Sequence, residues 1–259
     1  IKKIIAIASG KGGVGKSTTA VNLAVALSSL GQRVGILDAD VYGPSLPRML
    51  GITDKPKPLA NKRIAPLEAH GVKVMSMGFM VPEDTAMVWR GPMVIGALEQ
   101  MMREVEWGAL DVLIVDMPPG TGDAQLTMAQ RVPLAGVVIV STPQDIALID
   151  ARKGMNMFAK VNVPVLGIVE NMSMFICPNC GEQTDIFGHG GARAEAVRQG
   201  CDFLGEIPLN VAIRITSDSG QPITASEPDG PHAAAYRDLA SAVLAKISTA
   251  TMRPAPSIS

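Results

Sequence analysis

The sequence predicts an α/β fold, a doubly wound and mostly parallel β-sheet with helices on both faces. Short apolar runs rich in β-branched residues alternate with longer stretches in which apolar residues recur at helical spacing. A glycine-rich segment, G-K-G-G-V-G-K-S, lies between the first apolar run, at residues 4–8, and the first helical pattern, at residues 18–30. Strand, glycine turn and helix in this order are the setting of a phosphate-binding loop.

The composition suits one large domain with a substantial core. The chain has 259 residues, of which 47% are hydrophobic and 18% charged. We assign residues 1–248 to a single domain and predict a disordered C-terminal tail at residues 249–259. A net charge of −1 and only 3% aromatic residues give no support to a nucleic-acid partner. No apolar run approaches the ~20 residues that a membrane span needs.

Three cysteines are too few for a disulfide framework and favour a reducing compartment. The chain begins at Ile1 rather than at a methionine, which is compatible with a processed or trimmed N-terminus.

The glycine-rich segment fits the phosphate-loop pattern G-x-x-x-x-G-K-[ST]. Its glycines let consecutive backbone N–H groups turn inward around a phosphate, at the positive end of the following helix. We expect Lys16 to reach the β- and γ-phosphates and the Ser17 hydroxyl to bind Mg²⁺. The residues expected to bind nucleotide here are Gly10, Lys11, Gly12, Gly13, Val14, Gly15, Lys16, Ser17 and Thr18.

A second lysine lies inside this loop. By itself, Lys11 is most simply a solvated loop residue. The variant motif K-G-G-V-G-K-S-T resembles that of the MinD, ParA and nitrogenase-iron-protein class of P-loop ATPases. The resemblance implies that Lys11 crosses a dimer interface to the partner's nucleotide, and so implies a homodimer that encloses ATP.

Acidic residues follow two of the predicted strands. The strand at residues 34–37 is followed by Asp38 and Asp40, near the expected phosphate crevice. We predict that Asp40 positions the attacking water and that Asp38 lies close to Mg²⁺ and its waters; alternatively, one of them is a turn aspartate. The strand at residues 112–116 ends in Asp116, which would hold Mg²⁺ through water. The glycine-hinged residues 117–123 suit a switch that senses the γ-phosphate.

The remaining predicted elements continue the alternation of strands and helices. Residues 52–69 are predicted to form an exposed excursion. Strands are expected at residues 72–77, 136–141, 163–169 and 203–207, and helices at 92–104, 145–161, 191–200 and 233–246. The β–α–β order predicts parallel pairing with right-handed crossovers. Asn171, after the strand at 163–169, offers both a donor and an acceptor; a capping or turn role is the alternative to a ligand contact.

The motif C-P-N-C places Cys177 and Cys180 at the spacing of a soft-metal knuckle. A tetrahedral thiolate site needs four ligands, and Cys201, about twenty residues away, is predicted to be a buried structural thiol. Two chains related by a two-fold axis would supply four thiolates, which fits a [4Fe–4S] cluster shared between subunits. A bridging zinc, a redox pair and a local disulfide are the alternatives. Among the histidines, His189 is notable because it follows the cysteines in a glycine-rich loop.

Several motifs together identify a family. The chain contains G-K-G-G-V-G-K-S-T, D-A-D-V-Y-G-P-S, V-W-R-G-P-M, V-D-M-P-P-G-T-G-D, S-T-P-Q-D-I-A-L and E-N-M-S followed by C-P-N-C. From about Lys3 to Ala245 it resembles the Mrp/ApbC group of iron–sulfur carrier ATPases. The cysteine motif is what separates this group from MinD and ParA.

The resemblance implies an ATPase that uses ATP and Mg²⁺. It further implies that the protein holds a labile [4Fe–4S] cluster between the subunits of a homodimer and delivers it to apo iron–sulfur proteins. It implies adenine contacts for Asn171, and more weakly for Pro208 and Leu209. We expect a cytoplasmic location, with the mitochondrial matrix as the alternative, and no insertion into a membrane.

Two departures from the family pattern are relevant. Many bacterial members carry an extra N-terminal domain, so a shorter member, a mitochondrial form or a trimmed chain is expected here. The cytosolic eukaryotic scaffolds have an additional N-terminal cysteine cluster that this sequence lacks.

The main alternative function is that of a MinD/ParA-type positioning ATPase with a structural zinc at the cysteines. That class usually has an amphipathic membrane helix at its C-terminus or a basic DNA-binding surface, and the sequence shows neither. A redox or metal-binding module without ATPase activity would leave the phosphate loop and the strand-end aspartates unexplained.

Overall fold

The computed structural model describes residues 1–41, 43–60, 62–79 and 91–249. Residues 250–259 of the predicted tail lie outside the described residues, and so does the first half of the motif V-W-R-G-P-M, at residues 88–90.

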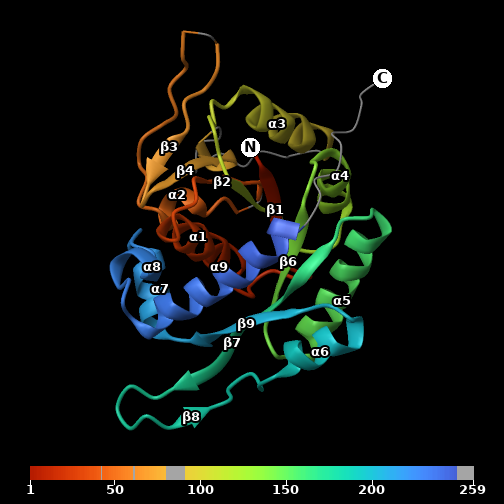
Figure 1. Cartoon of the computed structure of the whole chain (residues 1–259), viewed down its shortest axis with the longest axis vertical. Coiled ribbons are helices and arrows are strands. Elements are labelled where there is room, and N and C mark those ends of the chain that lie inside the picture. Colours follow the sequence, from red (N-terminus) through yellow and green to blue (C-terminus); the bar gives the residue numbers. More distant parts are fainter. Residues whose placement is uncertain (42, 61, 80–90, 250–259) are drawn as a thin grey trace.

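The core of the molecule is a parallel sheet, as predicted (Figure 1). In spatial order its strands are β4 (Val72–Ser76), β2 (Val34–Asp38), β5 (Val112–Asp116), β1 (Lys3–Ala8), β6 (Gly136–Ser141), β7 (Val165–Ile176) and β9 (Phe203–Leu209). Two short antiparallel strands extend it: β3 (Leu67–Ala69) pairs with β4, and β8 (Gln183–Thr184) pairs with β7. The carboxyl ends of the parallel strands meet at one edge, where ligands bind in sheets of this kind.

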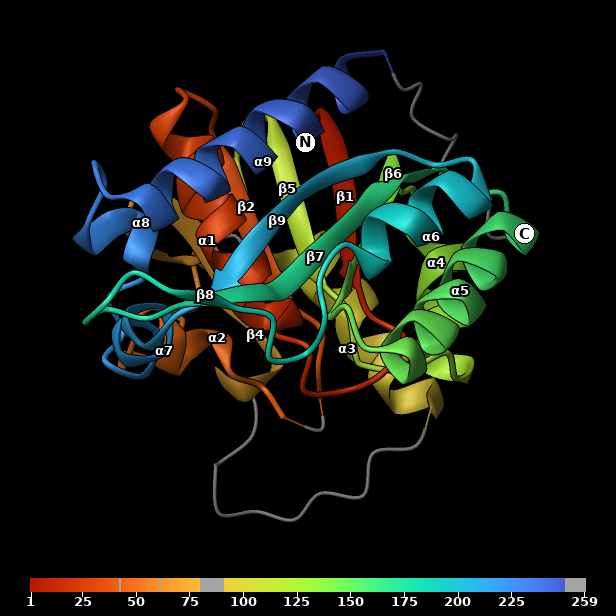
Figure 2. The same ribbon diagram turned by 90° about the horizontal axis from the view of Figure 1, so that it is seen from below.

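Helices cover both faces of the sheet, so the predicted doubly wound architecture is confirmed (Figure 2). One face packs against α1 (Lys16–Ser29), α2 (Leu46–Met49), α7 (Val211–Asp218), α8 (Ile223–Ser226) and α9 (Pro231–Thr249). The other packs against α3 (Gly91–Glu104), α4 (Asp123–Arg131), α5 (Asp145–Lys160) and α6 (Gly191–Gln199). Strand β1 shows the alternation that this requires, because Ile5 and Ile7 face the first layer whereas Ile4 and Ala6 face the second.

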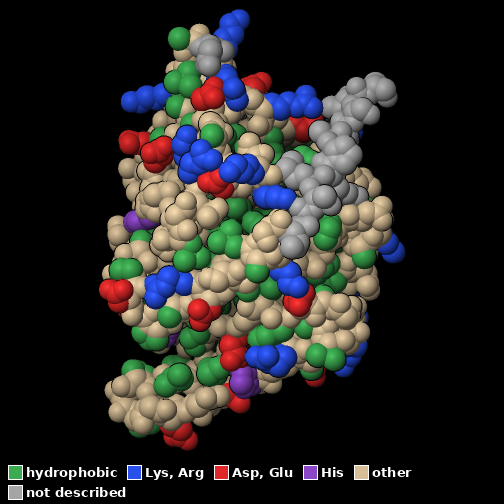
Figure 3. Space-filling view, viewed as in Figure 1, with side chains coloured by type: hydrophobic (Ala, Val, Ile, Leu, Met, Phe, Trp, Pro, Cys, Tyr) green, Lys and Arg blue, Asp and Glu red, His purple; other side chains and the backbone are tan. Residues whose placement is uncertain are grey.

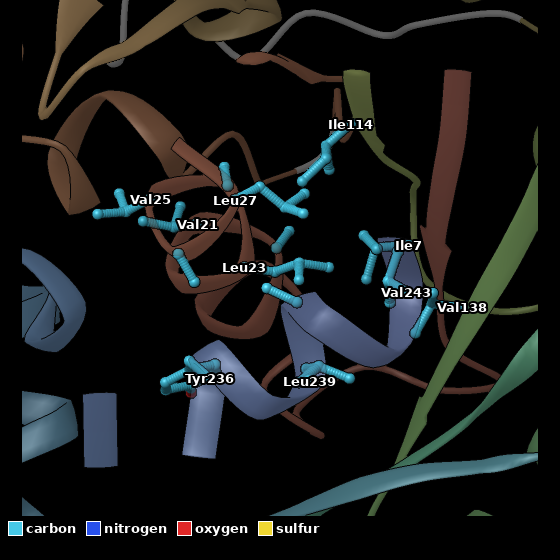
Figure 4. Close-up of a cluster of buried hydrophobic side chains, with 14 of the residues drawn as sticks. Ile7, Val21, Leu23, Val25, Leu27, Ile114, Val138, Tyr236, Leu239 and Val243 are labelled. Carbon is cyan, nitrogen blue, oxygen red and sulfur yellow. The ribbon is translucent and has the colours of Figure 1, made fainter. Parts of the chain in front are cut away.

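Helix α1 lies between the sheet and α9 (Figure 4). Leu23 and Leu27 are fully buried, together with Ile7 from the sheet and Tyr236 from α9. Burial on both sides explains why α1 is apolar around most of its circumference. The helix that begins at the phosphate loop is therefore fixed firmly in the core.

The structure contains short elements that were not predicted, namely α2, α8, β3 and β8, and it differs from the prediction in three longer ones. Strand β7 continues to Ile176 instead of ending near residue 169, because its outer part pairs with β8. Helix α4 begins at Asp123, directly after the predicted switch, and was not predicted. Helix α7 was also missed; it is capped by Asn210, whose Oδ1 accepts a hydrogen bond from the Ala212 N–H at 2.7 Å.

Candidate functional site

The phosphate loop joins β1 to α1 at the carboxyl edge of the sheet, and its glycines are needed for different reasons. Gly13 and Gly15 adopt positive φ, each at 80°. Gly10 is restricted by space instead: a Cβ there would lie 2.1 Å from the backbone carbonyl carbon of Asp150 in α5. The loop is therefore packed directly against the backbone of the second turn of α5 (Asp145–Lys160).

Asn171 holds the loop at Val14 and Gly15. Its side chain is only 6% exposed, and Nδ2 donates a hydrogen bond to the Val14 carbonyl at 2.8 Å. A Cβ on Gly15 would lie 2.1 Å from the same Nδ2. Asn171 thus fixes the shape of the loop, and its contact with adenine stays a prediction.

Lys16 forms a buried ion pair with Asp116. Its Nζ lies 2.6 Å from Asp116 Oδ1 and 3.2 Å from Ser17 Oγ. Burial raises the pKa of the Asp116 carboxyl, whereas the charge of Lys16 opposes that shift. The pair brings the phosphate-loop lysine and the strand-end aspartate together, although they are far apart in sequence.

Asp38 lies beside Asp116, since the two are register partners on β2 and β5. The Asp38 carboxylate is fully buried and accepts hydrogen bonds from the Ser76 hydroxyl at 2.9 Å and from the N–H groups of Asp40, Ser45 and Leu46. Burial and the charge of Asp116 together raise the pKa of Asp38 to about 7. Its visible role is to anchor the loop after β2; proximity to Mg²⁺ stays a prediction.

The donor set around Asp116 fits a hard cation. Asp116 Oδ2 is buried and lacks a hydrogen-bond partner within the described residues. The Ser17 hydroxyl helps to lower the pKa of the same carboxyl, and the charge of Asp40 acts to raise it. Carboxylate and hydroxyl oxygens are the ligands that Mg²⁺ prefers, and a cation there would favour the charged forms of both buried aspartates.

Lys11 lies on the outer part of the phosphate loop and is partly exposed. The loop around it is fixed by the Ser9 hydroxyl, which donates to the Lys11 carbonyl at 2.8 Å. The Ser9 carbonyl in turn accepts the Gly120 N–H at 3.1 Å, from the predicted switch after β5. The loop and the switch are thus directly connected, while contact of Lys11 with a partner subunit stays a prediction.

The two cysteines of the C-P-N-C motif lie at the tip of a hairpin that projects from the body of the molecule (Figure 1). Phe175 and Ile176 pair with Thr184 and Gln183 at its base. The hairpin is closed by hydrogen bonds from the Cys177 N–H to the Glu182 carbonyl and from the Gly181 N–H to the Cys177 carbonyl.

Both cysteines are free thiols: Cys177 is partly exposed and Cys180 is exposed. Hydrogen bonds from the backbone of Cys180 and Asn179 lower the pKa of the Cys177 thiol, which favours the thiolate needed for metal binding. The projecting hairpin shows few charged side chains on the face in view (Figure 3), and Ile176 and Ile186 are 46% and 52% exposed.

Cys201 belongs to a different environment. It is partly buried, packs against the hydrophobic cluster beneath α5 and contacts Met155 Sδ at 3.9 Å. Burial raises the pKa of its thiol, unlike that of Cys177. These features agree with the structural role predicted for it.

Pro208 and Leu209 end strand β9, where Leu209 pairs with Phe175 at the base of the cysteine hairpin. Their predicted contact with adenine stays a prediction. Two polar residues were not predicted to take part in the site: Ser76, which donates a hydrogen bond to Asp38, and Glu170, whose buried carboxylate accepts N–H bonds from Gly190 and Ala192. An acidic residue at a strand end was the available signal for Glu170.

None of the helices in the described part of the chain is long and apolar enough to cross a membrane.

Comparisons with curated proteins show close relatives. The chain is 56% identical over 249 residues to the iron–sulfur cluster transfer protein NUBPL of Dictyostelium discoideum, covering 95% of this chain and 77% of that protein. It is 57% identical over 242 residues to an iron–sulfur cluster carrier protein of Pseudomonas fragi, covering 93% and 84%.

Solved structures show the same architecture. A nucleotide-binding protein from Archaeoglobus fulgidus, in complex with ADP and with cobalt found in it, matches with a TM-score of 0.77 at 40% identity, covering 89% of each chain. The cell division ATPase MinD of Pyrococcus furiosus matches with a TM-score of 0.72 at 24% identity, covering 95% of this chain and 99% of that one, and supports the fold alone.

The family model described as ParA, NUBPL iron-transfer P-loop NTPase, matches residues 1–244. With the phosphate loop, the strand-end aspartates and the cysteine hairpin in place, this chain belongs to the family of NUBPL-type iron-transfer P-loop NTPases.

Proposed function

We propose that this protein is an ATPase that carries a [4Fe–4S] cluster between two copies of itself and delivers it to apo iron–sulfur proteins. The observation that carries the proposal is the exposed pair of thiols at the tip of a projecting hairpin, in a chain that also holds a complete phosphate loop. The names of its relatives as iron–sulfur carrier and transfer proteins support the same cargo.

The nucleotide half of this proposal assigns a role to each polar group. Lys16 and the N–H groups of the loop bind the phosphates, and Lys11 reaches the nucleotide of the partner subunit. Ser17 and Asp116 hold Mg²⁺, whose charge neutralises the phosphates. Asp40 orients the attacking water. Asn171, Pro208 and Leu209 border the adenine.

The proposal that the cluster is shared between two chains depends on the number of thiolates. One hairpin supplies two, Cys177 and Cys180, and Cys201 lies apart, partly buried against the hydrophobic core. A cluster with four thiolate ligands therefore requires two hairpins, one from each subunit. Ile176, next to Cys177 in the chain, and Ile186, which follows β8, are exposed and provide apolar surface for such a contact.

Strand β7 offers a physical connection between the two halves. Asn171 on this strand contacts the phosphate loop at Val14, and the same strand runs on to Ile176, next to Cys177. We propose that nucleotide binding and hydrolysis change how tightly Cys177 and Cys180 bind the cluster. The change would be transmitted through this strand and through the segments that follow Asp38 and Asp116.

Bacterial carriers and a mitochondrial plant protein both occur among the relatives. We therefore expect the protein to act in a reducing compartment, either the cytoplasm or the mitochondrial matrix.

Anaerobic reconstitution with iron and sulfide tests the cargo. The wild-type protein should bind about two irons per chain and become dimeric, since one four-iron cluster is shared. The Cys177→Ala/Cys180→Ala variant should bind none, whereas the matched control Cys201→Ala should bind as the wild type does. Iron content, the visible absorption band and the mass in solution are measured together. About half a zinc atom per chain in place of iron would instead indicate a structural zinc site and contradict the carrier proposal.

Asn171→Ala separates two roles of this residue. If Asn171 acts by holding the loop, the variant should weaken ATP and GTP equally and lower the free energy of unfolding by about 1–3 kcal/mol, because the Val14 carbonyl loses its partner. If it also contacts adenine, the preference for ATP over GTP should fall. Nucleotide titrations and denaturant unfolding of the variant measure both effects. Unchanged affinity and stability would exclude the first role.

A further inference from the structure

Two glutamates lie side by side behind the cysteine hairpin. Glu170 on β7 and Glu206 on β9 are register partners in the parallel sheet, where neighbouring strands are about 4.8 Å apart. Like charges at directly adjacent positions repel each other. Glu170 is also completely buried, and in the described part of the chain no lysine or arginine forms a salt bridge with either carboxylate.

An imidazole completes the cluster. His189 Nε2 lies 2.9 Å from Glu206 Oε2, and the ligand atoms of Glu170, His189 and Glu206 all lie within 4.8 Å of one another. Asp185 also acts electrostatically on His189. Negative charge therefore exceeds positive charge here even when the imidazole carries a proton.

The arrangement is close to what a metal ion requires. Metal bonds of about 2.0–2.2 Å to nitrogen and oxygen place neighbouring ligand atoms roughly 3.0–3.4 Å apart. The N–H groups of Gly190 and Ala192 fix the two oxygens of Glu170, at 2.8 and 2.7 Å, and each oxygen keeps a second lone pair. The side chains of His189 and Glu206 are 35% and 31% exposed, so water can fill the remaining coordination positions.

We propose that Glu170, His189 and Glu206 form a second metal site, which binds one first-row divalent transition-metal ion per chain. One imidazole nitrogen and carboxylate oxygens suit ions such as Co²⁺, Fe²⁺ or Zn²⁺, in contrast to the soft thiolate pair. The site goes beyond the proposed carrier function and does not depend on it.

The position of the site gives it a structural effect. Glu170 lies on β7, Glu206 on β9, and His189 in the segment that links β8 to α6. A bound ion would cross-link these three segments and so stabilise the base of the hairpin that carries the thiols.

A simpler account is that Glu170 only caps α6 while His189 and Glu206 form an ion pair. Titration with Co²⁺ distinguishes the two, measured by calorimetry and visible absorption in the Cys177→Ala/Cys180→Ala background. Because this background lacks the thiolate pair, the result does not depend on the carrier function. We expect one Co²⁺ per chain, without the sulfur-to-cobalt charge-transfer band that a thiolate site would give.

Adding His189→Ala should weaken Co²⁺ binding by more than about tenfold, since even the loss of an outer-shell partner has an effect of this size. The matched control His232→Ala should leave binding unchanged. Glu206→Gln, which keeps the shape of the side chain, should also weaken binding and serves if His189→Ala does not fold. Absence of stoichiometric binding, or equal binding by the Glu206→Gln and His232→Ala proteins, would overturn the proposal.

Discussion

Lys16→Met should abolish hydrolysis and destabilise the protein at the same time. We expect kcat to fall by at least about 10²–10³-fold, because a donor that stabilises the developing phosphate charge is lost. Since Lys16 Nζ lies 2.6 Å from the fully buried Asp116, the variant also leaves an unpaired charge in the core. Removal of one partner of a buried pair costs about 3–5 kcal/mol. Steady-state ATP hydrolysis and denaturant unfolding measure the two effects.

The pH dependence of the stability of Lys16→Met shows whether the unpaired Asp116 carboxylate causes the destabilisation. Burial already raises the pKa of Asp116 above 3.8, and loss of Lys16 raises it further. The folded state then binds a proton more tightly than the unfolded state, so the stability of the variant relative to wild type should fall as pH rises from about 4 toward neutrality. The double variant Lys16→Met/Asp116→Asn should regain stability and lose this pH dependence but stay inactive. A double variant as unstable as the single one would show that the ion pair is not the source of the effect.

Gly10→Ala should strongly destabilise the phosphate loop through a clash with backbone atoms. The new Cβ would lie 2.1 Å from the carbonyl carbon and 2.2 Å from the carbonyl oxygen of Asp150. These are backbone atoms of α5 and cannot rotate away, so either the loop or the helix must move. Overpacking typically costs about 1–3 kcal/mol, and we expect this variant to reach or exceed the upper end. Denaturant unfolding and nucleotide affinity should both show the loss.

The next glycine of the same motif provides the control. A Cβ on Gly12 would meet nothing nearer than Pro119 Cβ at 4.0 Å. Gly12→Ala should therefore change the free energy of unfolding by no more than about 0.5 kcal/mol. Equal destabilisation by Gly10→Ala and Gly12→Ala would mean that general loop stiffness, and not the contact with α5, explains the need for glycine.

These glycines show where sequence reasoning is sufficient and where it fails. The motif predicts a phosphate loop between a strand and a helix, and the structure has one. All the loop glycines look equivalent in the sequence, yet Gly13 and Gly15 are needed for positive φ and Gly10 for close packing. The difference depends on α5, which is brought against the loop only by the order of strands in the sheet.

The same limit applies to side-chain partners. Asp38 and Asp116 were each predicted to act near Mg²⁺ because each comes at the end of a strand, and the structure makes them register partners on β2 and β5. The hydrogen bond between Asn171 and Val14 spans 157 positions and depends on how far β7 extends. Local polarity made residues 170–173 resemble the end of a strand, whereas pairing with β9 and β8 carries the strand onward.

The cysteine hairpin depends on very little pairing. Only two residue pairs join its outer strand β8 to β7, whereas the phosphate loop is enclosed by the parallel sheet and its helices. Segments with so few contacts open locally, at a small fraction of the free energy needed to unfold the whole domain. A ligand bound at the tip would add its binding energy to this local equilibrium. Under the proposed function, amide hydrogen exchange in the hairpin should therefore report whether the thiols hold a cluster, and a cluster would leave without disturbing the core.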